Sequence, residues 1–357
     1  MTDQYPENGG PRKRLRKGRA SSGVTLQDVA EHAEVSTATV SRYLTSPDQV
    51  REERRTRIQS AIETLGYIPH GAAQALASQR SRTIGAIVPT LDNAIFARGI
   101  QEFQQRLQGA GYTLFVASND YSLDEERTQA ENLIMRGVDG IMLIGLDHDE
   151  RLFARLEQMG MPYINTWSYV RDSPHPCIGF DNFNAARRQA NYLLDIGHQR
   201  FGILCGITHD NDRARDRLDG ARSALAAHGV TVPDSMIYEC PYDIAASREK
   251  TKRLLAADSP PTAIICGNDI IAYGALLECQ ASGQRVPDDV TVVGFDDLPM
   301  SQHMQPGLTT VHVPSGAMGR KAADYLLARL NGEEAPAKIE LEANLILRAS
   351  AAPPRKR

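Results

Sequence analysis

The sequence predicts an N-terminal all-α helix-turn-helix unit followed by a larger α/β domain with parallel sheets. Residues 24–44 contain two short segments with apolar residues at helical spacing, separated by a tight turn. From residue 83 onward, short apolar runs alternate with helical patterns, which is typical of parallel sheets covered by helices on both faces. The length of 357 residues allows two or three domains.

The first helix is predicted over residues 26–33, with Thr25 as its N-cap and Asp28 in the first turn, where the helix dipole favours negative charge. Its apolar residues fall on one face: Leu26, Val29, Ala30 and Ala33. Ser36 can cap the second helix, with Val35 and Val40 packing inward. The side chains left on the open face of the second helix are Thr37, Ala38, Ser41 and Arg42.

This open face suits the DNA major groove. Short side chains at the start of a helix let its backbone sit deep in the groove. Thr37 and Ala38 can contact thymine methyl groups, and Arg42 can reach guanine or a phosphate. The alternative is an ordinary amphipathic helix pair, which is a common structure with no DNA-binding role.

A third helix is predicted over residues 52–65, where Ile58, Ile62 and Leu65 recur at helical spacing. The segment GYIP at 66–69 then ends it, because glycine and proline disfavour continuation. A stretch of small residues follows at 71–79. Four arginines suit either phosphate contacts or a solvated face: Arg51, Arg54, Arg55 and Arg57.

The α/β domain is indicated by a series of apolar runs with helical patterns between them. A continuous apolar strand is buried on both faces, so the series predicts parallel sheets, and it is long enough for two. The predicted strands cover residues 84–88, 113–117, 140–144, 201–205, 263–266 and 290–293.

Charge is distributed unevenly along the chain. Residues 1–82 contain 13 Lys and Arg against 9 Asp and Glu, a net charge of +4. The remaining 27 basic and 35 acidic residues give −8, so the whole-chain value of −4 conceals a basic end on an acidic body. This pattern favours a DNA-reading end joined to a separate sensor. The basic stretches at 12–19 and 353–357 suit either phosphate contacts or solvated tails.

Several functional classes lack their usual signals. No apolar run reaches the length of a membrane span, and no secretory signal is visible. The five cysteines (177, 205, 240, 266 and 279) lack paired metal spacing and favour buried free thiols in a reduced cytoplasmic protein. The histidines form no metal-spaced set, and no nucleophile motif, phosphate-binding glycine loop or cofactor motif is recognisable. The sequence therefore disfavours an enzyme.

In these features the chain resembles the LacI/GalR family of bacterial repressors. The resemblance covers nearly all of residues 24–348 and depends on an ordered series of motifs rather than on one. Two further pieces, GFDNF at 179–183 and ECQ at 278–280, look most like the gluconate-repressor branch. The motifs of the main series are the helix-turn-helix at 24–44, GYIP at 66–69, the linker through Arg82, TIGAIVP at 83–89, GVDG at 137–140, IGHQR at 196–200, VGFDD at 293–297 and LTT at 308–310.

The resemblance implies a two-lobed body, like that of periplasmic sugar-binding proteins. The chain would cross between the lobes near Asp181, near Val313 and near Pro336. The implied divisions are a basic tail (1–22), the helix-turn-helix domain (23–66), a hinge (67–82), the effector-binding and dimerisation domain (83–348) and a tail (349–357). Lobe 1 would comprise 83–181 and 314–335, and lobe 2 would comprise 182–313 and 336–348.

The same resemblance implies a homodimer that represses carbohydrate-catabolism genes. It would be released from a palindromic operator by a small sugar or sugar acid, such as gluconate, in preference to a purine. The hinge would fold on the DNA, with Ala73 and Leu76 at the minor groove and Leu76 wedged between base pairs. A sugar-binding transport protein would share the body without the helix-turn-helix unit, and a sugar-modifying enzyme would need an acid/base pair or a cofactor motif.

Polar and aromatic residues follow several predicted strands, where ligands bind in open parallel sheets. They can hold hydroxyl groups by paired hydrogen bonds, or stack on a sugar face. The family's ligand-contacting positions match Arg217, Asn268 and Asp296 best. Simpler alternatives are helix caps for Asp269 and Asp297, a core position for Trp167, and an interlobe salt bridge for Arg217. The candidate effector-binding residues are Asp92, Asn93, Trp167, Arg217, Tyr242, Asn268 and Asp296.

Overall fold

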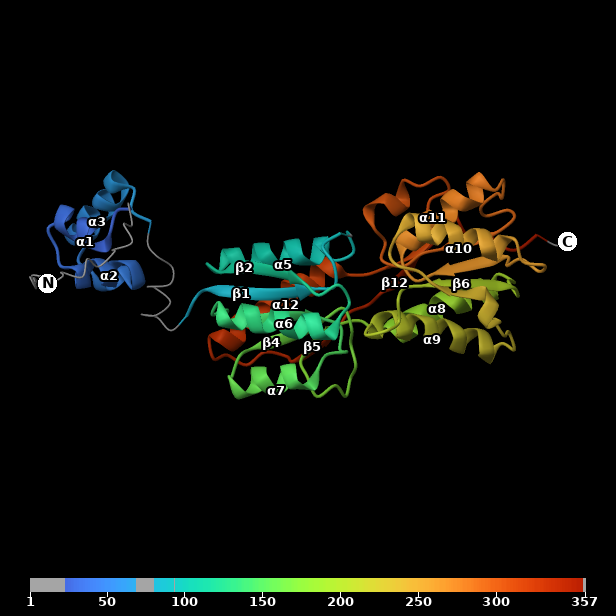
Figure 1. Cartoon of the computed structure of the whole chain (residues 1–357), viewed down its shortest axis with the longest axis horizontal. Coiled ribbons are helices and arrows are strands. Elements are labelled where there is room, and N and C mark those ends of the chain that lie inside the picture. Colours follow the sequence, from blue (N-terminus) through green and yellow to red (C-terminus); the bar gives the residue numbers. More distant parts are fainter. Residues whose placement is uncertain (1–22, 69–79, 93, 356–357) are drawn as a thin grey trace, which may run out of the picture. The chain divides into compact units, whose positions relative to one another are not determined.

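The computed structural model describes residues 23–68, 80–92 and 94–355. Its contacts divide the chain into two compact units, residues 1–81 and 82–357. We call them the helical unit and the α/β unit, and describe each by itself (Figure 1).

The helical unit contains three helices around a small apolar core. They are α1 (Leu26–His32), α2 (Thr37–Thr45) and α3 (Glu52–Leu65), with a short 3-10 helix η1 (Pro47–Gln49) before α3. Val29, Val40 and Ile58 are fully buried between the helices. The predicted caps are confirmed, since the Thr25 and Ser36 side chains accept hydrogen bonds from the Asp28 and Thr39 amides.

The C-terminal ends of α1 and α3 follow from local chemistry. Helix α1 ends at His32, one residue earlier than predicted, with Ala33 as its C-cap. Helix α3 ends at Leu65, and its C-cap Gly66 has a φ of 64°, a left-handed conformation that glycine adopts without steric cost. The helix-turn-helix predicted at residues 24–44 is therefore present.

In the α/β unit, lobe 1 is built on a six-stranded parallel sheet with the order β11-β5-β4-β3-β1-β2. Helices α5 (Ala97–Gly109) and α12 (Ser315–Leu330) pack on one face of this sheet, and α6 (Leu123–Met135) and α7 (Glu150–Gln158) pack on the other. The strands are β1 (Thr83–Val88), β2 (Thr113–Ser118), β3 (Gly140–Ile144), β4 (Tyr163–Thr166), β5 (Cys177–Gly179) and β11 (Lys338–Glu340).

Lobe 2 repeats this arrangement with a four-stranded parallel sheet in the order β7-β6-β8-β9. Helices α8 (Asn182–Asp195) and α9 (Asp212–Ala227) pack on one face, and α10 (Ile244–Leu255) and α11 (Asp269–Ala281) pack on the other. The strands are β6 (Phe201–Cys205), β7 (Ile237–Glu239), β8 (Ala263–Cys266) and β9 (Thr291–Val293), and the short 3-10 helices are η2 (Asp234–Met236) and η3 (Pro299–Gln302).

Three chain segments join the lobes. The first lies between β5 and α8, and the second between β10 (Thr310–His312) and α12, close to the positions that the family resemblance implies. The third differs from the expected crossing near Pro336, because β11 pairs with β5 and so keeps residues 338–340 in lobe 1. The chain crosses only afterwards, before β12 (Asn344–Ile346) pairs antiparallel with β10.

The C-terminal segment packs on lobe 2 and is not a solvated tail as far as Arg355. The backbone carbonyl of Ser350 accepts from the Val292 amide at 3.0 Å, and its hydroxyl donates to the Val292 carbonyl at 2.6 Å. Arg355 forms an ion pair with Asp288 at 2.8 Å. Ser350 and Ala352 therefore hydrogen-bond to β9, and Arg355 contacts the loop before it.

Candidate functional sites

The first candidate site is the open face of α2 in the helical unit. Thr37, Ala38 and Arg42 are exposed, and Ser41 is half-buried, as the sequence predicts. Ser36 caps the helix by accepting from the Thr39 amide, so the helix begins with short side chains. The small side chains of this surface permit a close approach by a partner, and Arg42 adds one long cationic side chain.

The arginines of the helical unit fall into two groups. Arg55 forms ion pairs with Asp48 and Glu52, and Arg57 forms one with Glu34 at 3.4 Å. Arg42, Arg51 and Arg54 form neither an ion pair nor a side-chain hydrogen bond with any residue the structure describes. The second group is the one whose charge is available to an anionic partner.

Thr25 has a structural role that accounts for its hydroxyl group. It donates to the Asp28 carboxylate at 2.7 Å and accepts from the Asp28 amide, which completes a capping box. Ala73 and Leu76, the predicted hinge contacts, lie outside the described residues.

The second candidate site is a small cavity between the two lobes of the α/β unit. Its volume is about 20 Å³, room for about one water molecule. It brings together five of the seven residues predicted from the sequence: Trp167, Arg217, Tyr242, Asn268 and Asp296. The other lining residues are Ile95, Phe96, Tyr121 and Arg213.

Of the two remaining predicted residues, only Asp92 is described by the structure, and it is not among the described residues that line the cavity. Asp92 is exposed, and its amide donates to the Thr90 hydroxyl at 3.0 Å. After β1 the chain turns so that Ile95 and Phe96, rather than Asp92, are buried and line the cavity. Asn93 lies outside the described residues.

Arg217 is held rigidly on the lobe 2 wall. Its Nε donates to Asn182 Oδ1 at 2.8 Å, and its Nη1 donates to the Gly267 carbonyl at 2.9 Å. Its guanidinium carbon lies 3.9 Å from the centre of the Phe295 ring, a cation–π contact. Its ion pair is with Asp296, at 3.5 Å from Nη1 to Oδ1. Both residues belong to lobe 2, so the interlobe salt bridge considered from the sequence is not formed by this pair.

The side chain of Asp296 is buried, and its carboxylate has no hydrogen-bond partner among the described residues. Neither carboxylate oxygen accepts a hydrogen bond from a described residue, and the Arg217 contact is an ion pair without hydrogen-bond geometry. The pKa of Asp296 is raised to about 7, chiefly by burial; the Arg217 guanidinium opposes this rise, and the Asp269 carboxylate adds to it. The backbone φ of 117° is unusual for a residue with a side chain, and such strain clusters at functional sites.

Two other polar groups in the cavity are also unsatisfied. Trp167 Nε1 and Asn268 Nδ2 are buried donors without an acceptor among the described residues. Asn268 Oδ1 caps α11 by accepting from the Ile271 amide at 2.9 Å, which fixes the direction of the amide group. Asn268, and not Asp269, is therefore the cap of this helix.

Asp269 and Asp297 have other structural roles. Asp269 accepts from the Leu298 amide and from the Ser301 and Thr310 hydroxyls at 2.6–2.8 Å. Asp297 forms ion pairs with Arg348 at 2.6 Å and His312 at 3.0 Å. Neither residue acts as the predicted helix cap.

Of the four lining residues that the sequence analysis missed, Tyr121 and Arg213 are the two that carry polar groups. Tyr121 lies after β2 and stacks on Tyr242 from lobe 2, with ring centres 5.4 Å apart and planes 27° apart. Arg213 lies one helical turn before Arg217 on α9. Ligands bind beyond the carboxyl ends of parallel strands, and Tyr121 lies just beyond the carboxyl end of β2. The same rule, applied to β2, would therefore have predicted Tyr121.

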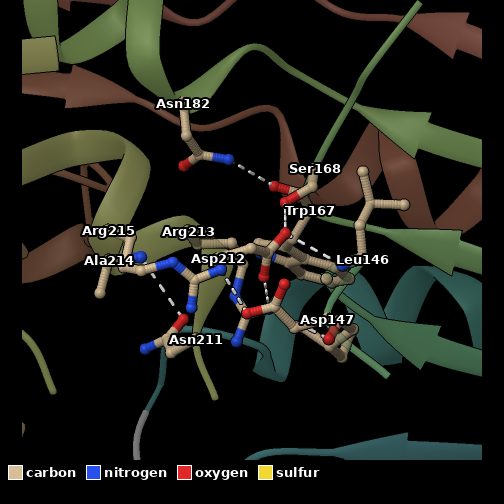
Figure 2. A network of polar contacts seen from close by, with 12 residues as sticks. Leu146, Asp147, Trp167, Ser168, Asn182, Asn211, Asp212, Arg213, Ala214 and Arg215 are labelled. Carbon is tan, nitrogen blue, oxygen red and sulfur yellow. Dashed lines mark hydrogen bonds and ion pairs between the residues drawn. The ribbon is translucent and has the colours of Figure 1, made fainter. Parts of the chain in front are cut away.

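A polar network joins the two lobes beside this cavity (Figure 2). From lobe 2, Asp212 accepts from the Leu146 amide at 3.0 Å and from the Ser168 hydroxyl at 2.6 Å. Arg213 Nη1 donates to the Ile144 carbonyl at 3.1 Å. Arg215 also forms an ion pair with Asp147. The start of α9 thus binds the loops that follow β3 and β4.

The described residues also bear on the expectations for thiols, metal ligands and membrane spans. The five cysteines are buried and free, as the sequence predicts. Within residues 23–68, 80–92 and 94–355, no cluster of three or more histidine, cysteine, aspartate or glutamate side chains is suited to a metal ion. None of the helices in these ranges is long and apolar enough to cross a bilayer.

The fold and the two sites define a ligand-responsive DNA-binding protein: a helix-turn-helix unit joined to a two-lobed body with a polar cavity. Residues 25–70 match the model of bacterial regulatory proteins of the lacI family, and residues 190–351 match a periplasmic binding protein-like domain. The chain is 33% identical to the regulator GntR of Escherichia coli K12, over 88% of this chain and 94% of that protein. It is 31% identical to the repressor CytR of the same strain, over 94% and 98%.

Solved structures give the same result. The lac repressor dimer bound to operator and the anti-inducer ONPF aligns with a TM-score of 0.82 at 27% identity, over 92% of this chain and 99% of that one. A complex of the regulator CelR with cellobiose aligns with a TM-score of 0.67 at 29% identity, over 92% and 100%. The chain therefore belongs to the lacI family, and it is a DNA-binding transcriptional regulator rather than an enzyme.

Proposed function

We propose that this chain is a cytoplasmic, dimeric repressor of carbohydrate-catabolism genes. A small sugar or sugar acid that binds between the lobes releases it from a palindromic operator. The observation that carries the effector class is the set of buried, unsatisfied polar groups that line the cavity from both lobes: Trp167 Nε1 from lobe 1, and Asn268 Nδ2 and the Asp296 carboxylate from lobe 2.

These groups have complementary needs that a hydroxylated ligand meets. Trp167 and Asn268 offer donors and require acceptors, whereas the Asp296 carboxylate requires donors. A hydroxyl group is both, so adjacent hydroxyls can satisfy all three residues at once. A buried polar group left unpaired costs about 1–3 kcal/mol, and a ligand that pairs these groups recovers that cost.

Solved relatives support the carbohydrate class. CelR was solved with cellobiose, and its structure aligns with 92% of this chain. The Tyr121–Tyr242 pair also suits a flat ring, so a purine or nucleoside is the competing ligand. Identities of 33% to GntR and 31% to CytR do not separate these branches. The unsatisfied hydroxyl-seeking groups favour the sugar or sugar acid.

The DNA-binding end of the proposal depends on α2. Thr37, Ala38, Ser41 and Arg42 would enter the major groove, and Thr25 and Arg51 would contact phosphates. From the family resemblance, Ala73 and Leu76 would bind the minor groove at the centre of the palindrome. Leu76→Ala should then weaken operator binding and reduce DNA bending while effector affinity is retained. Bending and affinity equal to wild type would leave Leu76 without this role.

Calorimetry of the purified full chain tests the effector class. The panel contains gluconate, neutral hexoses, cellobiose, a purine and a nucleoside, and each ligand that binds is then added to an operator gel shift. We expect a sugar or sugar acid to bind and to release DNA. Binding of the purine or nucleoside alone would overturn the carbohydrate assignment, and ligand-enhanced DNA binding would overturn release.

A matched pair of variants tests the site itself. Asp296→Ala should abolish the effector response while operator binding without ligand persists. The control is Asp258→Ala, which removes an exposed carboxylate from the same lobe. A response of Asp296→Ala at the wild-type effector concentration would remove Asp296 from the binding site.

A further inference from the structure

The cavity is too small for the ligand class proposed for it. Its volume of about 20 Å³ compares with roughly 300–1,000 Å³ for typical small-molecule sites. A sugar therefore enters only when the lobes move apart, and whatever holds the lobes together opposes that movement. The polar network at the start of α9 is the feature positioned to do so (Figure 2).

Asp212 is the centre of this network. It is the first residue of α9 and only 6% exposed. Its Oδ2 accepts from the Leu146 amide at 3.0 Å and from the Ser168 hydroxyl at 2.6 Å, and both donors belong to lobe 1. Hydrogen bonds to a carboxylate are stronger than those between neutral groups, so these two contacts are suited to holding the lobes together.

The same carboxylate holds Arg213 across the junction. Asp212 Oδ1 accepts from Arg213 Nη1 at 2.6 Å, and that nitrogen also donates to the Ile144 carbonyl of lobe 1. Arg213 is 7% exposed and lines the cavity. A buried guanidinium that lost its carboxylate would be an uncompensated charge, so the position of Arg213 depends on Asp212.

Lobe 1 is shaped to receive this pair at Gly145. A Cβ atom on Gly145 would lie 1.8 Å from Arg213 Nη1 and 2.5 Å from Asp212 Oδ1, and its φ is +97°. Only glycine allows lobe 2 to approach so closely. Behind it, His148 contacts the Gly145 carbonyl at 3.0 Å and Glu126 at 2.7 Å, which fixes the receiving loop from within lobe 1.

We propose that Asp212 is a positioning residue that closes the effector cleft. It joins the loops after β3 and β4 to lobe 2 and keeps Arg213 within the cavity. Effector entry must break these contacts, so their strength sets how readily the lobes part. The inference goes beyond the proposed function, because it concerns lobe closure and holds whether the effector is a sugar, a sugar acid or a purine.

Hydrogen exchange of the full-length protein tests the proposal without an effector. Asp212→Ala should accelerate exchange of the peptide covering residues 142–148, where the Leu146 amide loses its acceptor, by about tenfold or more. Trp167, the only tryptophan, is 1% exposed at the same junction, so its quenching by acrylamide should rise severalfold. The control is Asp219→Ala, which removes an exposed carboxylate from the same helix.

The core strand β8 distinguishes cleft opening from unfolding. If its peptide also exchanges faster in Asp212→Ala, the same measurements are made on Asp212→Asn, which keeps the side-chain shape. Faster exchange at 142–148 with β8 unchanged, in either variant, supports the proposal. Ser168→Ala should give a smaller effect in the same direction. Unchanged exchange and quenching, or parallel acceleration of the loop and β8 in both variants, would overturn it.

Discussion

Arg217 and Asp296 face each other across 3.5 Å on one wall of the interlobe cavity, yet the contact leaves both carboxylate oxygens of Asp296 without a hydrogen bond from a described residue. Arg217 instead donates to Asn182 and to the Gly267 carbonyl. The arginine is thus held by the protein, whereas the carboxylate is left to accept from another molecule. A buried ion pair of this kind is weak evidence for stability, and the free acceptors of Asp296 are the basis of its proposed role in ligand binding.

The first prediction concerns the cost of burying Asp296. A pKa raised from 3.8 to about 7 means that the folded state binds this proton more tightly than the unfolded state does. The associated stability is fully present below pH 3.8 and is lost as pH rises through about 7. An asparagine side chain in its place does not titrate. As pH rises from 5 to 8, the unfolding free energy of wild type should therefore fall relative to that of Asp296→Asn by up to roughly 3 kcal/mol.

Denaturant unfolding at the two pH values checks this. Asp216 and Asp269, whose pKa values are also raised by burial to about 6, remain in both proteins, so the difference between the proteins isolates Asp296. A stability difference that is the same at pH 5 and pH 8 would contradict the prediction.

The second prediction concerns operator recognition by Arg42. Its exposed side chain forms no ion pair with a described residue, so it is available to a base or phosphate. Arg42→Ala should cost ~1–3 kcal/mol in operator affinity if it makes a bidentate base contact. Gel-shift titration measures this cost, with Arg253→Ala as a control of equal charge change in lobe 2. Equal affinities for the two variants would argue against a role for Arg42.

The third prediction concerns the cap of the recognition helix. The Ser36 hydroxyl accepts from the Thr39 amide at the start of α2. Ser36→Ala should destabilise the helical unit by about 0.5–2 kcal/mol, while Ser36→Gly should cost only a few tenths. Exchange of amides in α2 reports the loss locally. Protection that is unchanged in Ser36→Ala would show that packing of Val40 alone holds the helix.

The fourth prediction concerns the independence of the two units. The contacts divide between residue 81 and residue 82, and each unit has its own apolar core. Removing residues 1–81 should therefore abolish operator binding and leave the calorimetric affinity for the effector within about twofold. Residual sequence-specific DNA binding by residues 82–357 would show that a DNA-contacting surface had been assigned to the wrong unit.

Local patterns in the sequence were sufficient for the helical unit and for the class of the body. Caps such as Ser36 and apolar positions such as Val29 and Ile58 act within a few residues, so spacing alone locates the helices. Parallel strands carry their ligand-facing residues just beyond their carboxyl ends, which is why Trp167, Asn268 and Asp296 were predicted and now line one cavity.

Only the tertiary structure decided which residues meet across the lobes. Asp212 and Arg213 lie 44 or more positions from the lobe 1 groups they contact, and no local pattern relates such distant residues. The path of the turn after β1 put Ile95, rather than Asp92, at the cavity, and pairing with β5 kept β11 in lobe 1. Spacing along the chain determines whether a segment forms a helix or a strand. Which residues it contacts is determined by how the two lobes close, because closure depends on shape and charge contributed by both lobes.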